Sequence, residues 1–197
     1  MSLQGVVESL HGWCTVEKAE RLYQLIKESD SKLTVELGVF AGRSFIPMAI
    51  AHRDKQSGFA IGVDAWKAGV CIEGTNAEAN NQYWKNVNYK EVYQSCINAI
   101  DQYDLKDYCD TLRMRSSQAG ILFADNIIDV LHQDSNHNIE TIIAELKLWS
   151  PKVKKGGYWI IDDCDWVEAV DGYKKIPDYG FQLVEDHIHW QIWRKIK

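Results

Sequence analysis

The sequence predicts an α/β domain built on a doubly wound, mostly parallel sheet with helices on both faces. Short runs of apolar and β-branched residues alternate along the chain with longer segments whose apolar residues recur at helical spacing. Several of the short runs end in glycine or aspartate, which is typical of parallel strands whose carboxyl ends border a ligand crevice. With 197 residues and 46% hydrophobic residues, we expect one domain over residues 1–197.

The composition of the chain limits the kinds of partner that the protein can bind. The net charge is −6 at pH 7 and no basic block occurs, so we expect no nucleic-acid partner. No run approaches the roughly 18 apolar residues of a membrane span, and the N-terminus lacks the pattern of an export signal. The five cysteines contain no Cys-x-x-Cys pair, which argues against a disulfide framework or a structural zinc site. We therefore expect a cytoplasmic protein without a membrane partner that acts on small molecules, and a homo-oligomer is compatible with the sequence.

The N-terminal segment, residues 1–31, is expected to be helical. Thr15 is a suitable N-cap for a helix over residues 16–27. The apolar residues on one face of this helix are Val16, Ala19, Leu22, Tyr23 and Ile26. This amphipathic helix precedes the first predicted strand.

Residues 33–44 predict a strand, a tight turn and the start of a second helix. Gly38 and Gly42 lack a Cβ, so the backbone can take unusual dihedral angles there and a ligand can approach the main chain. Free N–H groups at the start of the helix over residues 44–52 favour polar or anionic ligand groups. Glu36, near the end of the strand, is expected to face the same crevice.

A second strand is expected at residues 59–64, after a helix whose last residue, His52, should be exposed. Asp64 ends this strand about one βαβ unit after the glycines. In doubly wound folds an acid at this place can accept both ribose hydroxyls of an adenosine-containing cofactor. The alternative is an ordinary strand-end aspartate that caps the next segment. The glycine spacing differs from the Gly-x-Gly-x-x-Gly of dinucleotide-binding folds, which disfavours a nicotinamide or flavin enzyme.

Residues 65–95 break the regular alternation and are expected to form a variable loop on the acceptor side of the crevice. The aromatic residues spread through it include Trp66, Tyr83, Trp84, Tyr89 and Tyr93. Such rings could stack on a sugar or an aromatic acceptor, or they could seal the top of the core. The sequence favours neither role.

The remaining elements continue the alternation. Helices are expected at residues 92–100 and 139–149, strands at 110–115, 127–134 and 158–161, and a closing hairpin at 181–185 and 188–193. Asp134 ends one of these strands, and Asp162 and Asp163 end the next. Because the carboxyl ends of parallel strands meet at one edge of a sheet, we expect these acids to lie close to Glu36 and Asp64.

Three carboxylates at one edge would repel one another unless a proton or a cation intervenes. Oxygen ligands without a thiolate favour Mg²⁺ or Ca²⁺, so Asp134, Asp162 and Asp163 predict a magnesium site. His137 follows closely and could act as a general base for a hydroxyl, because imidazole titrates near neutral pH. Two alternatives stay open: His137 packs beside its helix start, or His132 joins Asp134 and His137 in a transition-metal site.

The pattern Glu-x-Gly-x-x-x-Gly-x-Ser, from Glu36 to Ser44, resembles the first motif of the class I S-adenosylmethionine-dependent methyltransferases. The resemblance implies a Rossmann-like sheet of seven strands with the last strand antiparallel, and S-adenosylmethionine as cofactor. It places Glu36 near the methionine part and the glycines beneath the cofactor, and it implies cofactor contacts from Ser44 and Asp134. Ser117 and Gln118 resemble a Ser-Gln pair that touches adenine in catechol-type O-methyltransferases; the alternative is a helix cap followed by a solvent-facing glutamine.

Residues 127–163 resemble the macrocin O-methyltransferase branch. Its members carry an Asp-Gly-Asp-His-type turn, a helix, a Gly-Gly and a strand that ends in two acids. Here the turn reads Asp134, Ser135, Asn136 and His137, so the first acid and the histidine keep their spacing. Ser135 and Asn136 replace the Gly-Asp of that turn, so this chain has no counterpart of the turn's second acid.

Together these observations predict an S-adenosylmethionine-dependent O-methyltransferase, assisted by Mg²⁺ and with His137 as general base, that methylates a hydroxyl of a small metabolite. The macrocin-type resemblance favours a sugar or a glycosylated natural product as acceptor. Two rivals remain: a metal-independent methyltransferase acting on nitrogen or another oxygen acceptor, and a non-catalytic cofactor-binding domain of the same fold.

Overall fold

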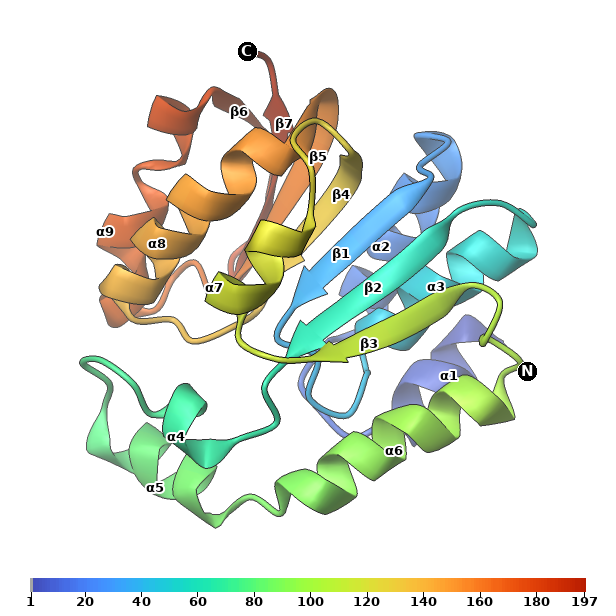
Figure 1. The fold of residues 1–197 in the computed structure, drawn as a ribbon, viewed down its shortest axis with the longest axis horizontal. Coiled ribbons are helices and arrows are strands. Elements are labelled where there is room, and N and C mark those ends of the chain that lie inside the picture. The colour runs from blue at the N-terminus through green and yellow to red at the C-terminus, as the bar shows by residue number, and fades with distance from the viewer. Residues whose placement is uncertain (1) are drawn as a thin grey trace.

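Seven strands form one sheet within residues 2–197, the part of the chain that the computed structural model describes (Figure 1). The strands are β1 (Leu33–Leu37), β2 (Phe59–Asp64), β3 (Cys109–Arg113), β4 (Ile128–Gln133), β5 (Val153–Asp162), β6 (Phe181–Asp186) and β7 (Trp190–Lys195). Their order is β3-β2-β1-β4-β5-β7-β6. Strand β7 runs antiparallel to β5 and β6, and the other neighbouring pairs are parallel. The predicted doubly wound sheet with an antiparallel last strand is confirmed.

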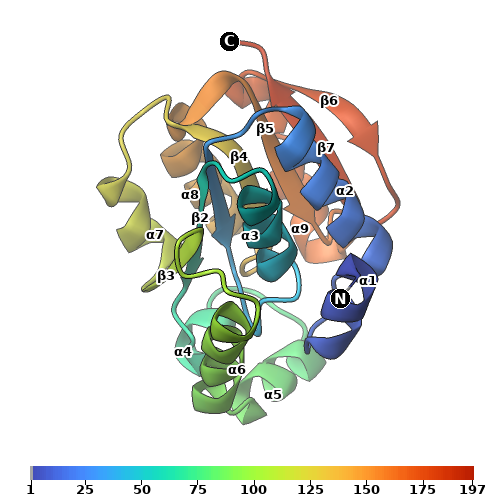
Figure 2. The ribbon, with the colours of Figure 1, turned by 90° about the vertical axis from the view of Figure 1, so that its right-hand side faces the viewer.

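Helices cover both faces of the sheet, as Figures 1 and 2 show. Helices α2, α3 and α6 lie on one face, and α7, α8 and α9 lie on the other. The helices are α1 (Leu3–Ser9), α2 (Val16–Glu28), α3 (Phe45–Asp54), α4 (Ala68–Cys71), α5 (Glu78–Asn86), α6 (Tyr89–Gln102), α7 (Ser116–Ala119), α8 (Ile139–Trp149) and α9 (Val167–Tyr173). Across residues 2–197, none of them has the length and apolar character needed to cross a bilayer.

Helix α2 begins where the sequence predicts, because the Thr15 hydroxyl accepts a hydrogen bond from the backbone N–H of Lys18 at 3.2 Å. The buried face of α2 includes Ala19, Leu22 and Ile26 and packs against α3. Lys18 is buried on α2 as well, with 2% of its surface exposed. A charged side chain in this position requires a partner.

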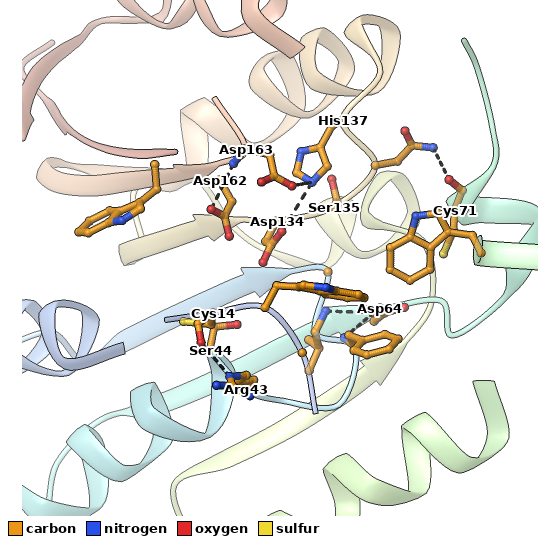
Figure 3. A pocket seen from close by; sticks show the side chains of 18 of the residues that line it. Cys14, Arg43, Ser44, Asp64, Cys71, Asp134, Ser135, His137, Asp162 and Asp163 are labelled. Carbon is orange, nitrogen blue, oxygen red and sulfur yellow. Dashed lines mark hydrogen bonds and ion pairs between the residues drawn. The ribbon is translucent and has the colours of Figure 1, made fainter. Parts of the chain in front are cut away.

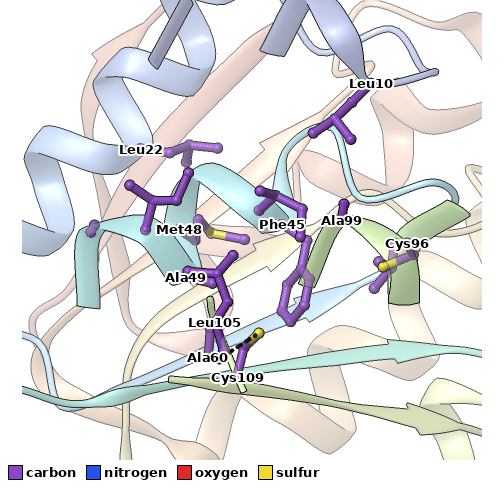
Figure 4. Packing of buried hydrophobic residues seen from close by; sticks show 14 of the residues in the cluster. Leu10, Leu22, Phe45, Met48, Ala49, Ala60, Cys96, Ala99, Leu105 and Cys109 are labelled. Atoms are coloured by element: carbon purple, nitrogen blue, oxygen red, sulfur yellow. Dashed lines mark hydrogen bonds between the residues drawn. The ribbon is translucent and has the colours of Figure 1, made fainter. Parts of the chain in front are cut away.

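Two apolar cores hold the sheet in place, because alternate side chains of each strand point to opposite faces. On one face, Leu22, Phe45 and Met48 pack with Ala60 of β2 (Figure 4). On the other face, Leu37 of β1 belongs to a cluster that includes the fully buried side chains of Trp149 and Trp159. The carboxyl ends of β1, β2, β4 and β5 therefore have fixed positions relative to one another.

The segment over residues 65–95 contains short helices rather than a continuous loop. Helices α4 and α5 lie within it, and α6 begins at Tyr89 with the Asn88 side chain as its N-cap. Neither α4 nor α5 contains a buried residue. Without a buried face these helices need no apolar period, which explains why the sequence shows none. In Figure 1 both helices lie beyond the carboxyl ends of the strands.

The expectation that His52 is exposed is wrong, because its side chain is fully buried. Its Nδ1 donates to the carbonyl of Ser57 at 3.0 Å, and its Nε2 accepts from the Thr34 hydroxyl at 2.8 Å. Helix α3 is apolar on nearly all sides and is buried up to His52, so its end is covered by the surrounding chain. Burial lowers the pKa of His52 to about 4.

Acidification should therefore destabilise the fold through His52. The unfolded chain binds this proton near pH 6.5, whereas the folded protein resists it down to a pKa of about 4. The stabilisation is present above pH 6.5 and is lost as the pH falls towards 4, by up to about 3 kcal/mol. Urea unfolding between pH 7 and 4.5 should show a shallower loss of stability for His52→Gln than for the unmodified protein. Equal slopes for the two proteins would contradict this account.

Candidate active site

A cavity of about 890 Å³ opens at the carboxyl ends of β1, β2, β4 and β5. Its volume lies within the roughly 300–1,000 Å³ of small-molecule sites. Residues 11–15, helix α5 and the β6–β7 hairpin complete its walls. Figure 3 shows Ser44 and Asp64 on one wall and Asp134, His137 and Asp163 on the opposite wall.

The turn after β1 passes against the turn after β4. Gly38 has φ +85°, and a Cβ added there would lie 2.0 Å from the carbonyl oxygen of Asp134. Gly38 N donates to Val63 O at 2.9 Å, and Asp134 N donates to Leu37 O at 2.8 Å. These hydrogen bonds continue the backbone pairing of the sheet into both turns. They hold the main chain at Gly38 close to the carbonyl of Asp134. Only glycine fits here without moving the main chain.

Asp64 holds the glycine turn in place. Its Oδ2 accepts the backbone N–H groups of Val39 and Phe40, each at 3.0 Å, and its Oδ1 accepts that of Trp66 at 2.7 Å. Burial raises the pKa of Asp64, and the three N–H donors act in the opposite direction. The capping role that the sequence left open is thus present, and the ribose role stays a prediction.

Glu36 is fully buried beneath the cavity wall. Its Oε1 accepts the hydroxyl of Ser44 at 2.6 Å and lies 2.7 Å from Nδ1 of His132. Glu36 Oε2 and His132 Nε2 have no hydrogen-bond partner within residues 2–197. Burial raises the pKa of Glu36 and lowers the pKa of His132. Glu36 therefore acts through Ser44, which it orients and which lines the cavity.

The carboxylate cluster, which we define as Asp134, Asp162 and Asp163, lies beside His137. Nε2 of His137 is 3.2 Å from Asp163 Oδ2 and 3.6 Å from Asp134 Oδ1. One ligand atom from each of Asp134, His137 and Asp163 lies within 4.8 Å of the other two. Asp162 belongs to a second group of the same kind, with His132 and Asp134. Asp134 is shared, so the predicted metal ligands are divided between two adjoining groups.

Lys18 supplies a positive charge to this cluster. Its ammonium group forms an ion pair with Asp162 Oδ2. Burial would lower the pKa of Lys18, but Asp162 and Asp134 outweigh burial and raise it. Burial would also raise the pKa of Asp162, yet the ammonium holds that pKa well below its usual range. Burial and the adjacent Asp162 raise the pKa of Asp134 well above its usual range. The ammonium group of Lys18 thus offsets part of the negative charge of the carboxylate cluster.

Four predicted cofactor residues do not line the cavity: Glu36, Gly42, Ser117 and Gln118. Ser117 and Gln118 are exposed in α7, and Arg115 and Ser116 line the cavity instead. Gln118 Oε1 accepts the backbone N–H of Arg115 at 3.4 Å, which is the helix-capping arrangement. Gly42 has φ +91° and packs against the side chains of Ile46 and Cys96. The cofactor contacts of these four residues stay predictions.

The two positions where the turn after β4 departs from the macrocin pattern have structural roles. The Ser135 hydroxyl donates to the buried carboxylate of Glu145 at 2.7 Å. The Asn136 amide donates to the carbonyls of Cys71 at 3.1 Å and Glu73 at 2.9 Å. The Asn136 bonds connect the segment over residues 65–95 to the turn that carries His137, and the Ser135 bond connects that turn to α8.

Aromatic rings from three parts of the chain meet at the cavity. The ring of Trp13 lies 5.3 Å from that of Phe40, 5.6 Å from Tyr83 and 5.9 Å from Trp84, between centroids. Trp13 is 63% exposed and Tyr83 is 42% exposed, whereas Trp66 is buried. Trp66 belongs to the apolar core, which is one of the two roles that the sequence left open. Trp66, Tyr83, Trp84 and Tyr89 all line the cavity, and stacking on an acceptor stays a prediction.

The sequence matches the profile of a family described as "Methyltransferase domain" over residues 35–164, which is more than half of the chain. The chain belongs to this methyltransferase family. The matched region includes the glycine turn, Asp64 and the carboxylate cluster. An uncharacterized protein of Acanthamoeba polyphaga mimivirus is 27% identical over 140 residues, which cover 69% of this methyltransferase. The chain spans about half of that viral protein's length, 53%.

Solved structures of O-methyltransferases share the fold of this methyltransferase. NovP superposes with a TM-score of 0.70 at 19% identity, covering 92% of this chain and 81% of NovP. TomG from Streptomyces achromogenes, involved in tomaymycin synthesis and solved with S-adenosylmethionine, gives 0.62 at 12% identity, covering 94% and 82%. An S-adenosylmethionine-dependent O-methyltransferase from Thermotoga maritima gives 0.68 at 13% identity, covering 100% and 72%. These structures confirm the predicted Rossmann-like fold, and the family match confirms the predicted methyltransferase class. The macrocin branch stays a prediction.

Two residues that shape the methyltransferase site, Lys18 and Arg43, are not predicted from the sequence. Lys18 is on the buried side of α2, and a signal was present because it precedes Leu22 and Leu25 at helical spacing. Arg43 Nε donates to the carbonyl of Cys14 at 2.8 Å and holds the loop that leads into α2. No sequence pattern marks this contact, because it depends on the path of the loop.

Replacing Gly38 should disrupt the site more than replacing a glycine elsewhere. In Gly38→Ala the new methyl group meets the main chain of Asp134 and occupies a positive φ, so we expect a loss of about 2 kcal/mol or more in unfolding free energy. Gly69→Ala is the matched control, because nothing lies within 4 Å of its added Cβ. Chemical denaturation of both variants measures the difference. Equal stabilities would show that the two turns do not meet as closely as described.

Proposed function

We propose that this methyltransferase transfers the methyl group of S-adenosylmethionine to a hydroxyl of a small metabolite. The observation that carries the proposal is the single cavity in which the glycine turn with Asp64 faces His137 and the carboxylate cluster. S-adenosylmethionine is present in the structure of TomG, which shares the fold, and this supports the choice of cofactor by analogy.

The wall formed by the glycine turn fits a cofactor of this kind. Gly38 leaves room at the main chain, and the Ser44 hydroxyl is held by Glu36. Backbone N–H groups occupy three of the roughly four lone-pair positions of Asp64, which leaves capacity for a ribose hydroxyl. Bound S-adenosylmethionine would supply an activated methyl group on sulfur. Of the proposed cofactor residues, Gly38, Ser44, Asp64 and Asp134 line the cavity. Glu36 would act through Ser44, and contacts from Gly42, Ser117 and Gln118, which lie outside the lining, are proposed on the resemblance alone.

The opposite wall fits a hard divalent cation in part. Asp134 and Asp163 offer carboxylate oxygens close to one another, whereas Asp162 is already paired with Lys18. We propose that Asp134 and Asp163 hold Mg²⁺, and that Asp162 joins them when Lys18 releases it. Mg²⁺ in this place would make an acceptor hydroxyl more acidic.

His137 is the proposed general base. Its Nε2 is directed towards Asp163 and Asp134, and the ring of Trp166 lies 5.3 Å from the imidazole between centroids. An acceptor hydroxyl beside Nε2 would pass its proton to that nitrogen while the oxygen–methyl bond forms and the sulfur–methyl bond breaks. The chain would mainly align the acceptor oxygen with the methyl carbon.

The aromatic rings at the cavity support an acceptor that contains a ring. Trp13 and Tyr83 are exposed, so they can stack on the apolar face of a sugar or of a fused ring system. With the macrocin-type resemblance, this favours a sugar or a glycosylated natural product. We propose a single cytoplasmic domain over residues 1–197, with residues 65–95 on the acceptor side.

A metal-independent methyltransferase is the second candidate, and one observation favours it. The ammonium group of Lys18 already neutralises Asp162, so part of the charge that a metal would supply is present. In that case the base and the alignment of the acceptor would provide the catalysis.

Removing the imidazole tests the proposed base. In His137→Ala we expect turnover to fall by roughly a hundredfold to ten-thousandfold, the usual span for loss of general-base catalysis, with cofactor affinity nearly unchanged. Release of S-adenosylhomocysteine is measured with a panel of free sugars, glycosides and catechols. A variant that keeps near-normal turnover on its best acceptor would reduce His137 to a structural residue.

A further inference from the structure

Lys18 brings a positive charge from the N-terminal helix to the strand ends. Only 3% of its side chain is exposed, and the Asp162 side chain that it contacts is 16% exposed. Both residues line the cavity. The ion pair therefore lies at the wall of the active site and not within the apolar core of α2.

A buried polar atom near this ion pair, Nε2 of His132, lacks a hydrogen-bond partner within residues 2–197. A ring nitrogen of the same histidine lies within 4.8 Å of a carboxylate oxygen of Asp134 and of Asp162. A buried nitrogen without a partner is costly, and it is retained where a ligand or water completes the site. The region next to Lys18 thus offers nitrogen and oxygen donors for a cation other than the ammonium.

We propose that Lys18 is the resident cation of the carboxylate cluster and that its ammonium competes with a divalent metal for Asp162. The inference rests on the metal site of the proposed function. While Lys18 holds Asp162, a metal has Asp134 and Asp163 as its acidic ligands; a metal that also takes Asp162 displaces the ammonium.

The ammonium opposes metal binding in both arrangements. Two positive charges a few Å apart at a partly buried site repel each other, and the pairing of Asp162 with Lys18 removes one ligand. Lys18 therefore sets how strongly the methyltransferase binds a metal. It leaves the cofactor wall at Gly38 and Asp64 unchanged, because its ion pair is with the opposite wall.

The test compares Mg²⁺ binding to the unmodified protein and to Lys18→Met by isothermal titration calorimetry. Methionine keeps the length and the apolar stem of lysine and removes the charge, so we expect Mg²⁺ to bind about tenfold tighter or more. Lys27→Met on the exposed side of the same helix is the matched control and should bind as the unmodified protein does. Adding Asp163→Asn to Lys18→Met should abolish the gain.

Equal or weaker Mg²⁺ binding by Lys18→Met, including no binding by either protein, would overturn the inference. Circular dichroism checks that the variant is folded. If Lys18→Met fails to fold, Lys18→Gln takes its place, because an amide can still donate to Asp162, and the same gain is expected. Titration of the same samples with S-adenosylmethionine separates this result from a failure of the proposed function, since cofactor binding should be equal in all of them.

Discussion

The close passage of the main chain at Gly38 over the carbonyl of Asp134 is the constraint on which the site depends. It joins the turn after β1 to the turn after β4, and through them the cofactor wall to the wall that carries His137. Beneath this contact, Glu36 and His132 are register partners on β1 and β4, and their side chains form a buried pair. A change in either turn would therefore move both walls of the cavity.

Buried polar groups join the elements around this contact. The Glu36–His132 pair holds the Ser44 hydroxyl at the cofactor wall, and the Lys18–Asp162 pair connects α2 to the end of β5. Such groups are costly to bury unless they are paired, so each pair favours one arrangement of the strand ends over others. The same pairs determine which carboxylates are free to act, and this links the stability of the fold to the chemistry of the site.

The sequence predicted the sheet, its helical cover and the gathering of acids at one edge, because these follow from local periodicity and from the geometry of parallel strands. It did not predict the burial of His52, since a polar residue at the end of an apolar helix gives no sign of what covers it. Nor did it show that Lys18 would pair with Asp162, because that contact joins residues far apart in the chain. Gln118 matched a family pattern by position, yet its side chain caps a helix outside the cavity.

The central claim is that the glycine turn and Asp64 form a site for S-adenosylmethionine. Calorimetric titration of the unmodified protein with S-adenosylmethionine, and with NAD⁺ in a parallel run, tests it most directly. The account predicts saturable binding of one S-adenosylmethionine per chain and no heat of binding with NAD⁺. Saturable binding of NAD⁺, or the absence of any binding of S-adenosylmethionine to the folded protein, would contradict it.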